Sequence, residues 1–322
     1  MAPTFTKTLL TVADLGPGDL LRILELSERD DLGAPLAGRG VALYFEKPSA
    51  RTRNSMEMAV VQLGGHPVHI RKDEIDPGVR ESVADVARTL ACYHALIAAR
   101  VTDHRLLVEM AETSASPVIN MLSDTDHPLQ ALADLLTVRQ LLGRLKGTRI
   151  AFIGDGANNV CRSLAQGCAL AGAELRIASP AGHGLPAAEL ALLDGVEQVL
   201  DAAEAADGAQ IVYTDVWASM GDEAEAGQRA ERFAPYHVDW ALMARTDNAW
   251  FLHCLPARRG EEVAAEVIDG PRSAVWRQAA NRMHSARGAM TWLLEGDHDR
   301  GEDQAAARDR RAFARMASAE PG

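Results

Sequence analysis

The sequence predicts an α/β fold with two doubly wound domains, each built on a parallel sheet, and a cleft between them. Three observations favour this fold. The chain has 322 residues, which is too long for one compact core. Apolar runs alternate with amphipathic runs almost throughout, as expected for strands followed by helices. A glycine-bounded break at residues 143–147 separates two such series.

The first series is predicted from its periodicity. Residues 51–63 carry apolar side chains at the i, i+3, i+4 and i+7 spacing of an amphipathic helix, namely Met56, Ala59, Val60 and Leu63. Helices with the same pattern are predicted at residues 83–92 and 128–141. Short apolar runs predict strands at residues 41–46, 67–70, 95–99 and 117–120.

The second series begins after the break. Predicted strands lie at residues 149–153, 174–178, 210–213 and 249–252, with a helix at residues 160–170. We therefore expect domains at residues 1–145 and 146–282, and a C-terminal helix of about residues 283–322 that packs back on the first domain. From about residue 296 the chain is highly charged, which predicts an exposed helical tail.

Composition excludes several classes of partner. Acidic residues exceed basic ones by 12 and the pI is about 5.3, so neither a nucleic acid nor an anionic membrane is an expected partner. No apolar run is long enough for a membrane helix, and a cytoplasmic location is expected. The four cysteines show no metal-ligand spacing, so we expect neither a disulfide framework nor a metal site.

The run Lys47-Pro48-Ser49-Ala50-Arg51-Thr52-Arg53 joins a predicted strand to a predicted helix. Ser49 is a good N-cap, and the unpaired N–H groups and positive dipole end of a helix favour an anion. Arg51, Thr52 and Arg53 add donors suited to phosphate. The same run is also typical of a capped helix with two solvated arginines.

A second helix opens with His127-Pro128-Leu129-Gln130. An imidazole and an amide at this point could polarise a carbonyl and hold an NH₂ group, although a histidine at a helix start more often binds no ligand. The run Gly154-Asp155-Gly156-Ala157-Asn158-Asn159 lacks the third glycine of a dinucleotide loop. Asn159 instead suggests a polar contact to a small ligand.

Two further motifs follow short strands. Asp215 and Cys254 should emerge at strand carboxyl ends, where open α/β sheets bind ligands. A carboxylate and a nearby thiol make a plausible amine-binding pocket, although a cysteine in apolar surroundings is usually inert and the aspartate could cap a turn. Arg282, near the end of the chain, would ordinarily be a surface residue.

In this order the segments resemble the ornithine carbamoyltransferases, over about residues 7–295. The matching motifs are FEKPSARTR, RESVADVARTL, HPLQALAD, IGDGANN, YTDVWASMG, FLHCLP and NRMH. The resemblance implies a first domain that binds carbamoyl phosphate, a second that binds ornithine, and transfer of the carbamoyl group to the ornithine side-chain amine, giving citrulline and phosphate. It implies no cofactor and no metal.

The resemblance also implies residue roles. Carbamoyl phosphate would be bound by Ser49, Ala50, Arg51, Thr52, Arg53, Arg100, His127, Gln130, Cys254, Leu255 and Arg282. Ornithine would be bound by Asn159, Asp215, Ser219 and Met220. The catalytic residues would be Arg100, His127, Asp215, Cys254 and Arg282. The family is typically trimeric, so we expect a homotrimer or a multiple of trimers in which residues 72–80 complete a neighbour's site.

The sequence departs from the family at the phosphate end. Asp76 stands where glutamine is usual, and a carboxylate near phosphate is unfavourable unless Arg80 or another cation compensates. Ala50 replaces a usual threonine, Asp126 stands where an aromatic or apolar residue is common, and Ala280 replaces a common glutamate. Two alternatives therefore remain: a carbamoyltransferase for another amine, such as lysine, putrescine or a modified ornithine, and a catalytically silent relative.

Overall fold

A computed structural model of the protein describes residues 7–217 and 226–295. These residues form two compact units. Unit 1 contains residues 7–132 and 282–295, and unit 2 contains residues 133–217 and 226–281. The first division falls within α6 (Pro128–Leu142), whereas the sequence places the domain boundary near residue 145, in the loop after this helix.

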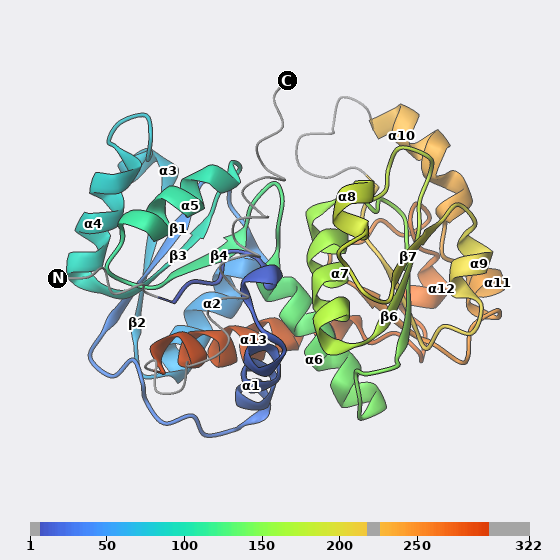
Figure 1. The fold of residues 1–322 in the computed structure, drawn as a ribbon, viewed down its shortest axis with the longest axis horizontal. Helices are drawn as coiled ribbons and strands as arrows, with labels where there is room; N and C mark the ends of the chain where they lie inside the picture. Colours follow the sequence, from blue (N-terminus) through green and yellow to red (C-terminus); the bar gives the residue numbers. More distant parts are fainter. Residues whose placement is uncertain (1–6, 218–225, 296–322) are drawn as a thin grey trace. The chain divides into compact units, whose positions relative to one another are not determined.

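Unit 1 is built on four parallel strands in the order β2-β1-β3-β4 (Figure 1). The strands are β1 (Gly40–Phe45), β2 (His66–Arg71), β3 (His94–Arg100) and β4 (Val118–Leu122). The helices are η1 (Val12–Asp14), α1 (Pro17–Glu28), α2 (Ala50–Gln62), α3 (Lys72–Ile75), α4 (Val83–Tyr93) and α5 (His104–Thr113). The chain reverses direction across the sheet between β1 and β3, and ligands bind at such switch points.

Helices cover both faces of the unit 1 sheet. Tyr44 of β1 and Ile97 of β3 are buried in one apolar cluster with Leu107 and Met110 of α5. Figure 1 shows α2 and α13 (Val275–Leu294) on the opposite side of the sheet from α4 and α5. With both faces covered, the strand ends are where side chains can reach a ligand.

The C-terminal part of unit 1 closes against its first helix. Gly288 of α13 lies so close to α1 that a Cβ atom there would be 2.2 Å from Ser27 Oγ and 2.5 Å from Ile23 O. Trp292 Nε1 donates a hydrogen bond to Asp19 Oδ1 (3.0 Å). Any larger residue at position 288 would therefore push the two helices apart.

Unit 2 contains five parallel strands in the order β7-β6-β5-β8-β9. The strands are β5 (Arg149–Ile153), β6 (Glu174–Ala178), β7 (Val196–Val199), β8 (Ile211–Thr214) and β9 (Trp250–His253). The helices are α7 (Asn159–Ala171), α8 (Ala187–Leu190), α9 (Ala202–Ala206), α10 (Ala226–Phe233), η3 (Ala234–Tyr236), α11 (Trp240–Met243) and α12 (Ala265–Ile268). The switch point lies between β5 and β8.

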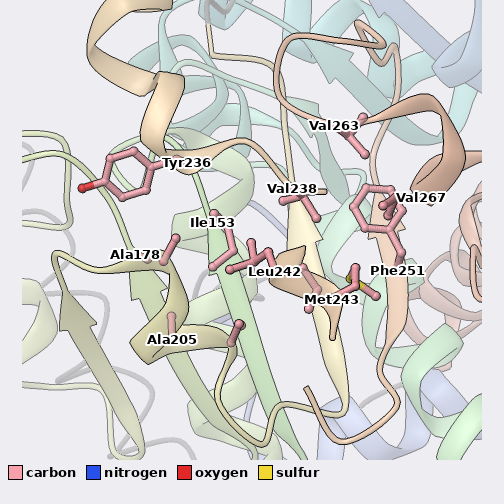
Figure 2. Packing of buried hydrophobic residues seen from close by; sticks show 14 of the residues in the cluster. Ile153, Ala178, Ala205, Tyr236, Val238, Leu242, Met243, Phe251, Val263 and Val267 are labelled. Atoms are coloured by element: carbon pink, nitrogen blue, oxygen red, sulfur yellow. The ribbon is translucent and has the colours of Figure 1, made fainter. Parts of the chain in front are cut away.

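The core of unit 2 lies on both sides of its sheet. Ile153 of β5 and Phe251 of β9 pack with Leu242 of α11 in one apolar cluster (Figure 2). Phe152, which points to the other face because side chains alternate along a strand, stacks on Tyr213 of β8 with ring centroids 5.5 Å apart. This double burial explains why β5 and β8 are short continuous apolar runs in the sequence.

The predicted parallel α/β fold is confirmed, and the predicted strands and helices up to residue 252 are present to within two residues at their ends. The C-terminal helix predicted from about residue 283 begins earlier, because α13 starts at Val275. The edge strand β7 was not predicted, because its Glu197 and Gln198 interrupt the apolar pattern. The charged tail predicted from about residue 296 lies outside the described residues.

Two exclusions can also be compared with the structure. Over residues 7–217 and 226–295, no helix combines the length and apolar character needed to cross a bilayer. The four cysteines all lie in these ranges and form no disulfide there.

Candidate active site

The loop after β1 leads directly into α2. As predicted, Ser49 is the N-cap: its hydroxyl accepts a hydrogen bond from the Thr52 N–H (3.5 Å). The same hydroxyl donates to Thr52 Oγ1 (3.2 Å), and Thr52 is buried. Since β1 borders the switch point, the helix presents its N–H groups and positive dipole end where a ligand is expected. This end of α2 suits an anion.

The remaining residues of this run are exposed. Arg53 forms an ion pair with Glu57 one turn along α2, with 2.7 Å between Nε and Oε1. Ala50 is the first residue of α2, and only its backbone N–H can donate a hydrogen bond to an anion. Because Arg53 already has a carboxylate partner, Arg51 is the better placed of the two arginines to meet an incoming anion.

Arg100 ends β3, the strand beside β1 at the switch point. Its side chain is buried, and its backbone carbonyl accepts a hydrogen bond from the N–H of Glu46 (2.9 Å), the residue that follows β1. Because β1 and β3 are adjacent and parallel, their carboxyl ends lie at the same edge of the sheet. Arg100 therefore lies next to the start of the 47–53 run.

Arg282 joins three helices of unit 1. Its Nη1 donates to Gln130 Oε1 of α6 (2.6 Å), and its Nη2 donates to Thr52 Oγ1 of α2 (3.3 Å). All three side chains are buried, and only 7 % of Arg282 is exposed. The expectation that Arg282 is an ordinary surface residue is therefore wrong, because a planar guanidinium can reach two acceptors at once and stay hydrogen-bonded inside the unit.

His127 is buried beside these arginines. Burial lowers the pKa of its imidazole well below the usual value, and the positive charges of Arg282, Arg100 and Arg51 lower it further. A neutral imidazole can hydrogen-bond a carbonyl without adding a charge. Unit 1 therefore gathers cationic and neutral donors near the N-terminus of α2, which is the arrangement needed for an anionic acyl compound.

The chain after β2 carries Asp76, one of the residues at which this sequence departs from the family pattern. Asp76 has a left-handed backbone (φ +33°), and its Oδ1 lies 3.6 Å from Lys72 Nζ. Lys72 also forms an ion pair with Glu46 (3.0 Å). Arg80, named in the sequence analysis as a compensating cation, instead donates to the backbone carbonyl of Glu74 (3.0 Å). Lys72 is thus the cation that offsets the charge of Asp76.

In unit 2, Asp215 and Cys254 follow the adjacent strands β8 and β9. The Cys254 thiol donates to Asp215 Oδ1 (2.9 Å), which also accepts from the N–H of Val216 (2.8 Å). Burial raises the pKa of the Asp215 carboxyl, and the hydrogen bond from the thiol partly opposes that shift. The predicted carboxylate and thiol therefore meet, and they form a pair that can hold a proton.

An asparagine pair lies at the start of α7, after β5. Asn158 caps α7 by accepting from the N–H of Cys161 (2.7 Å), and its amide also donates to Asp215 Oδ2 (3.4 Å). Asn159, the residue chosen from the sequence, begins the helix one position later. The contact of Asn159 with a small ligand stays a prediction. Ser219 and Met220 lie outside the described residues.

The last residue of β9 forms a buried pair that was not predicted from the sequence. His253 Nε2 lies 3.1 Å from Glu262 Oε1, and both side chains are fully buried. Asp215, His253 and Cys254 each have one atom of a type that can bind a metal ion, and these three atoms lie within 4.8 Å of one another. Each of the three side chains also takes part in a hydrogen bond within the unit. Glu262 is nine residues from His253, and this separation gave no motif to find it by.

An ion pair supports the GDG turn. Arg229 of α10 contacts the carboxylate of Asp155, and both side chains are buried. Arg229 Nε also donates to the carbonyl of Trp217 (2.6 Å). One arginine therefore connects the turn after β5 to the chain that follows Asp215, a role that the sequence analysis did not assign.

Comparison with known protein families gives a match in each half of the chain. Residues 7–140 match the model described as the aspartate/ornithine carbamoyltransferase, carbamoyl-P binding domain. Residues 146–293 match the model described as the aspartate/ornithine carbamoyltransferase, Asp/Orn binding domain. The two matches together cover most of the chain and include α2, Arg100, His127, Asp215, Cys254 and Arg282.

Individual relatives agree with these matches. The ornithine carbamoyltransferase of Hyperthermus butylicus is 44% identical over 309 residues, which cover 91% of this chain and 98% of that protein. The solved ornithine carbamoyltransferase of Pyrococcus furiosus superposes with a TM-score of 0.87 at 36% identity, covering 92% of this chain and 99% of that one. The enzyme of that name from Thermus thermophilus gives a TM-score of 0.83 at 41% identity, covering 91% and 100%.

Proposed function

The chain belongs to the aspartate/ornithine carbamoyltransferase family, and we propose that it transfers the carbamoyl group of carbamoyl phosphate to the side-chain amine of L-ornithine. The products are L-citrulline and phosphate. The reaction is attack of a neutral amine on a carbonyl carbon: the new C–N bond forms, the C–O bond to phosphate breaks, and the nitrogen loses a proton.

The observation that carries this proposal is the buried donor set of unit 1. Arg282 hydrogen-bonds Gln130 and Thr52 there, near the N-terminus of α2. Arginines and helix N–H groups stabilise the charge that develops on the carbonyl oxygen and on the departing phosphate. His127, held neutral by burial and by the neighbouring arginines, can hydrogen-bond the carbonyl oxygen.

The acceptor end of the proposal rests on unit 2. An alkylammonium has a pKa of about 10, so it must lose a proton before it can attack. Asp215, which has a raised pKa and accepts a hydrogen bond from the Cys254 thiol, is proposed to receive that proton on its carboxylate. A carboxylate also favours the amino groups of an α-amino acid. The enzyme must also bind the two substrates in the orientation needed for attack, and this raises the rate by increasing their effective concentration.

The residue roles are part of the same proposal. Carbamoyl phosphate is bound by Ser49, Ala50, Arg51, Thr52, Arg53, Arg100, His127, Gln130, Arg282, Cys254 and the backbone of Leu255. Ornithine is bound by Asn159, Asp215, Ser219 and Met220, and Asn158 is added because its amide donates to Asp215. The Leu255 carbonyl is proposed to face the carbamoyl NH₂.

The test is an acceptor panel. Purified protein is incubated with carbamoyl phosphate and, separately, with ornithine, N-acetylornithine, lysine or putrescine, and both ureido product and phosphate are measured. Ornithine should give the highest kcat/KM. Equal or faster turnover of another amine would reassign the acceptor, and no ureido product from any amine would refute the proposed reaction.

We also propose that the protein assembles as a homotrimer or a multiple of trimers, in which residues 72–80 of one protomer complete the phosphate site of the next. Lys72 keeps a cation next to Asp76 in that loop. Sedimentation equilibrium should give a mass of about 104 kDa, three times 34.6 kDa, or a multiple of it. A monomer of full activity would contradict this assembly.

A cytoplasmic location and a role in arginine metabolism complete the proposal. Both rest on membership of this family, and the location can be measured directly. Cell fractionation with an antibody against the protein would test it.

A further inference from the structure

The side chain of His253 accepts a hydrogen bond from the backbone of the turn that follows β9. Its imidazole is fully buried, and its Nδ1 lies 2.9 Å from the backbone nitrogen of Leu255. A backbone N–H can only donate, so Nδ1 must be the acceptor and carries no proton. This contact spans Cys254, the residue between the two, and therefore shapes the backbone on both sides of the thiol.

The other ring nitrogen has the complementary role. His253 Nε2 lies 3.1 Å from Glu262 Oε1, which also accepts from the backbone N–H of Arg258 (2.5 Å). With Nδ1 acting as the acceptor, the ring proton is on Nε2 and is donated to Glu262. Glu262 thus selects the tautomer that leaves Nδ1 available to Leu255.

The backbone of Leu255 needs such support. Its φ is +60°, in the left-handed region, which costs a residue with a side chain free energy relative to the usual conformations. Residues in such conformations persist where the surroundings hold them, and they cluster at ligand-binding sites. The hydrogen bond to His253 fixes the peptide nitrogen of this residue.

A different role for His253, as a base that removes the thiol proton, does not fit these contacts. The Cys254 thiol donates to Asp215 Oδ1 (2.9 Å). Both nitrogens of His253 are occupied, one by Leu255 and one by Glu262. The thiol therefore has its own acceptor, and the imidazole is left with a positioning role.

We propose that His253 and Glu262 are positioning residues that fix the Leu255 backbone, so that its carbonyl faces the carbamoyl NH₂ during transfer. This inference rests on the proposed function of the Leu255 carbonyl. The pair acts through the Nδ1 acceptor of His253, and Glu262 acts by setting the tautomer.

Two substitutions of His253, to asparagine and to glutamine, distinguish the role of Nδ1 from that of Nε2. Asparagine places an oxygen near the position of Nδ1 and can still accept from Leu255, but it does not reach Glu262. Glutamine places an amide NH₂ near Nε2 and can still donate to position 262, but it lacks an acceptor for Leu255. Both are made together with Glu262→Gln, so that no buried charge loses its partner. His237→Gln, a partly exposed histidine of unit 2, is the control.

The proposal predicts an asymmetric result. His253→Asn/Glu262→Gln should keep kcat within about fivefold of Glu262→Gln alone, whereas His253→Gln/Glu262→Gln should lose at least about tenfold, because the Leu255 N–H is left without its acceptor. The KM for ornithine should change little in either variant. Thermal unfolding is measured alongside, since a merely structural role predicts that activity follows stability. Equal losses, or a larger loss in the asparagine variant, would overturn the inference.

Two further readouts separate this inference from the proposed function. Calorimetry with phosphonoacetamide, a stable analogue that retains the NH₂ group, should show weaker binding only in the glutamine variant, whether or not the wild-type protein makes citrulline. Proton–nitrogen correlation spectra of histidine-labelled full-length protein should show His253 protonated on Nε2 alone. A proton on Nδ1 would refute the hydrogen-bond assignment directly.

Discussion

At the scale of single residues, the surroundings of Asp215 change the chemistry of its carboxyl group. Burial raises the pKa of its carboxyl, and the Cys254 thiol and the Val216 N–H both donate to the same oxygen, Oδ1. A carboxyl with a raised pKa is a stronger base than one in water, which is what an acceptor of the ammonium proton needs.

Replacing this carboxylate should slow the reaction. Asp215→Asn removes the basic group and the charge-assisted hydrogen bond, so we expect kcat to fall by about a hundredfold or more. The acid limb of the kcat/KM profile reports the ionisation of Asp215 and should lie above the range of an ordinary carboxyl in the wild-type protein. Steady-state assays between pH 5 and 9 would measure both. Asp194→Asn, at an exposed site in the same unit, should have no such effect.

Arg282 makes a second prediction at this scale. Lysine keeps the charge but cannot donate to Gln130 and Thr52 together, so Arg282→Lys should raise the KM for carbamoyl phosphate by about ten- to a hundredfold. Initial-rate assays at saturating ornithine would show it. Arg277→Lys, an exposed arginine on the same helix, should leave that KM unchanged; a similar rise there would mean that the effect comes from the helix and not from the guanidinium contacts.

At the scale of elements, the start of α2 is where we propose that the phosphate of the substrate binds. Ser49 caps the helix and Ala50 is its first residue, exposed and without a hydroxyl. Ala50→Thr adds a donor at this end and should lower the KM for carbamoyl phosphate by up to about tenfold. Ala50→Val has nearly the same shape without the hydroxyl and should not lower it. If both variants behave alike, the hydroxyl has no role.

The helices and strands could be predicted because the residues that face the core recur in the sequence at the spacing of a helix or a strand. Met56, Ala59, Val60 and Leu63 are all fully buried, and this stripe alone identifies α2. β7 could not be identified, because an edge strand with Glu197 and Gln198 has no apolar run.

The site was predictable only where a motif lies next to an element end. Ser49 and Asp215 follow strands, and the sequence indicated both. The burial of Arg282 and the pairing of His253 with Glu262 depend on contacts between segments far apart in the chain or on a turn geometry that no periodicity encodes. The contact of Asn158 with Asp215 depends on where α7 begins, which the sequence does not fix to a single residue.

At the scale of the whole molecule, buried groups with shifted pKa values couple stability to pH. His127 has a pKa well below the usual value of about 6.5, so in the folded protein it stays neutral while in the unfolded chain it binds a proton as the pH falls. Its contribution to stability is therefore present above about pH 6.5 and is lost as the pH falls towards the folded-state pKa.

This coupling gives a prediction for unfolding. Between pH 7.5 and 5.5, the suppressed protonation of one such histidine costs about 1.4 kcal/mol. His127→Gln should reduce the loss of unfolding free energy over this interval by about that amount, measured by urea denaturation at both pH values. His94 and His284, whose pKa values burial also lowers, are present in both proteins and cancel from the comparison. An unchanged pH dependence would mean that His127 titrates normally in the folded chain.

The fit of Gly288 against Ile23 and Ser27 has a consequence for how the protein is made. Unit 1 is encoded in two stretches, and the second leaves the ribosome only after all of unit 2 has been synthesised. A nascent chain can therefore complete its downstream sheet while α1 still lacks the helix that packs on it. A stop codon just before residue 288 would leave all nine described strands intact, but it would remove Gly288 and Trp292, the residues of α13 that contact Ser27 and Asp19.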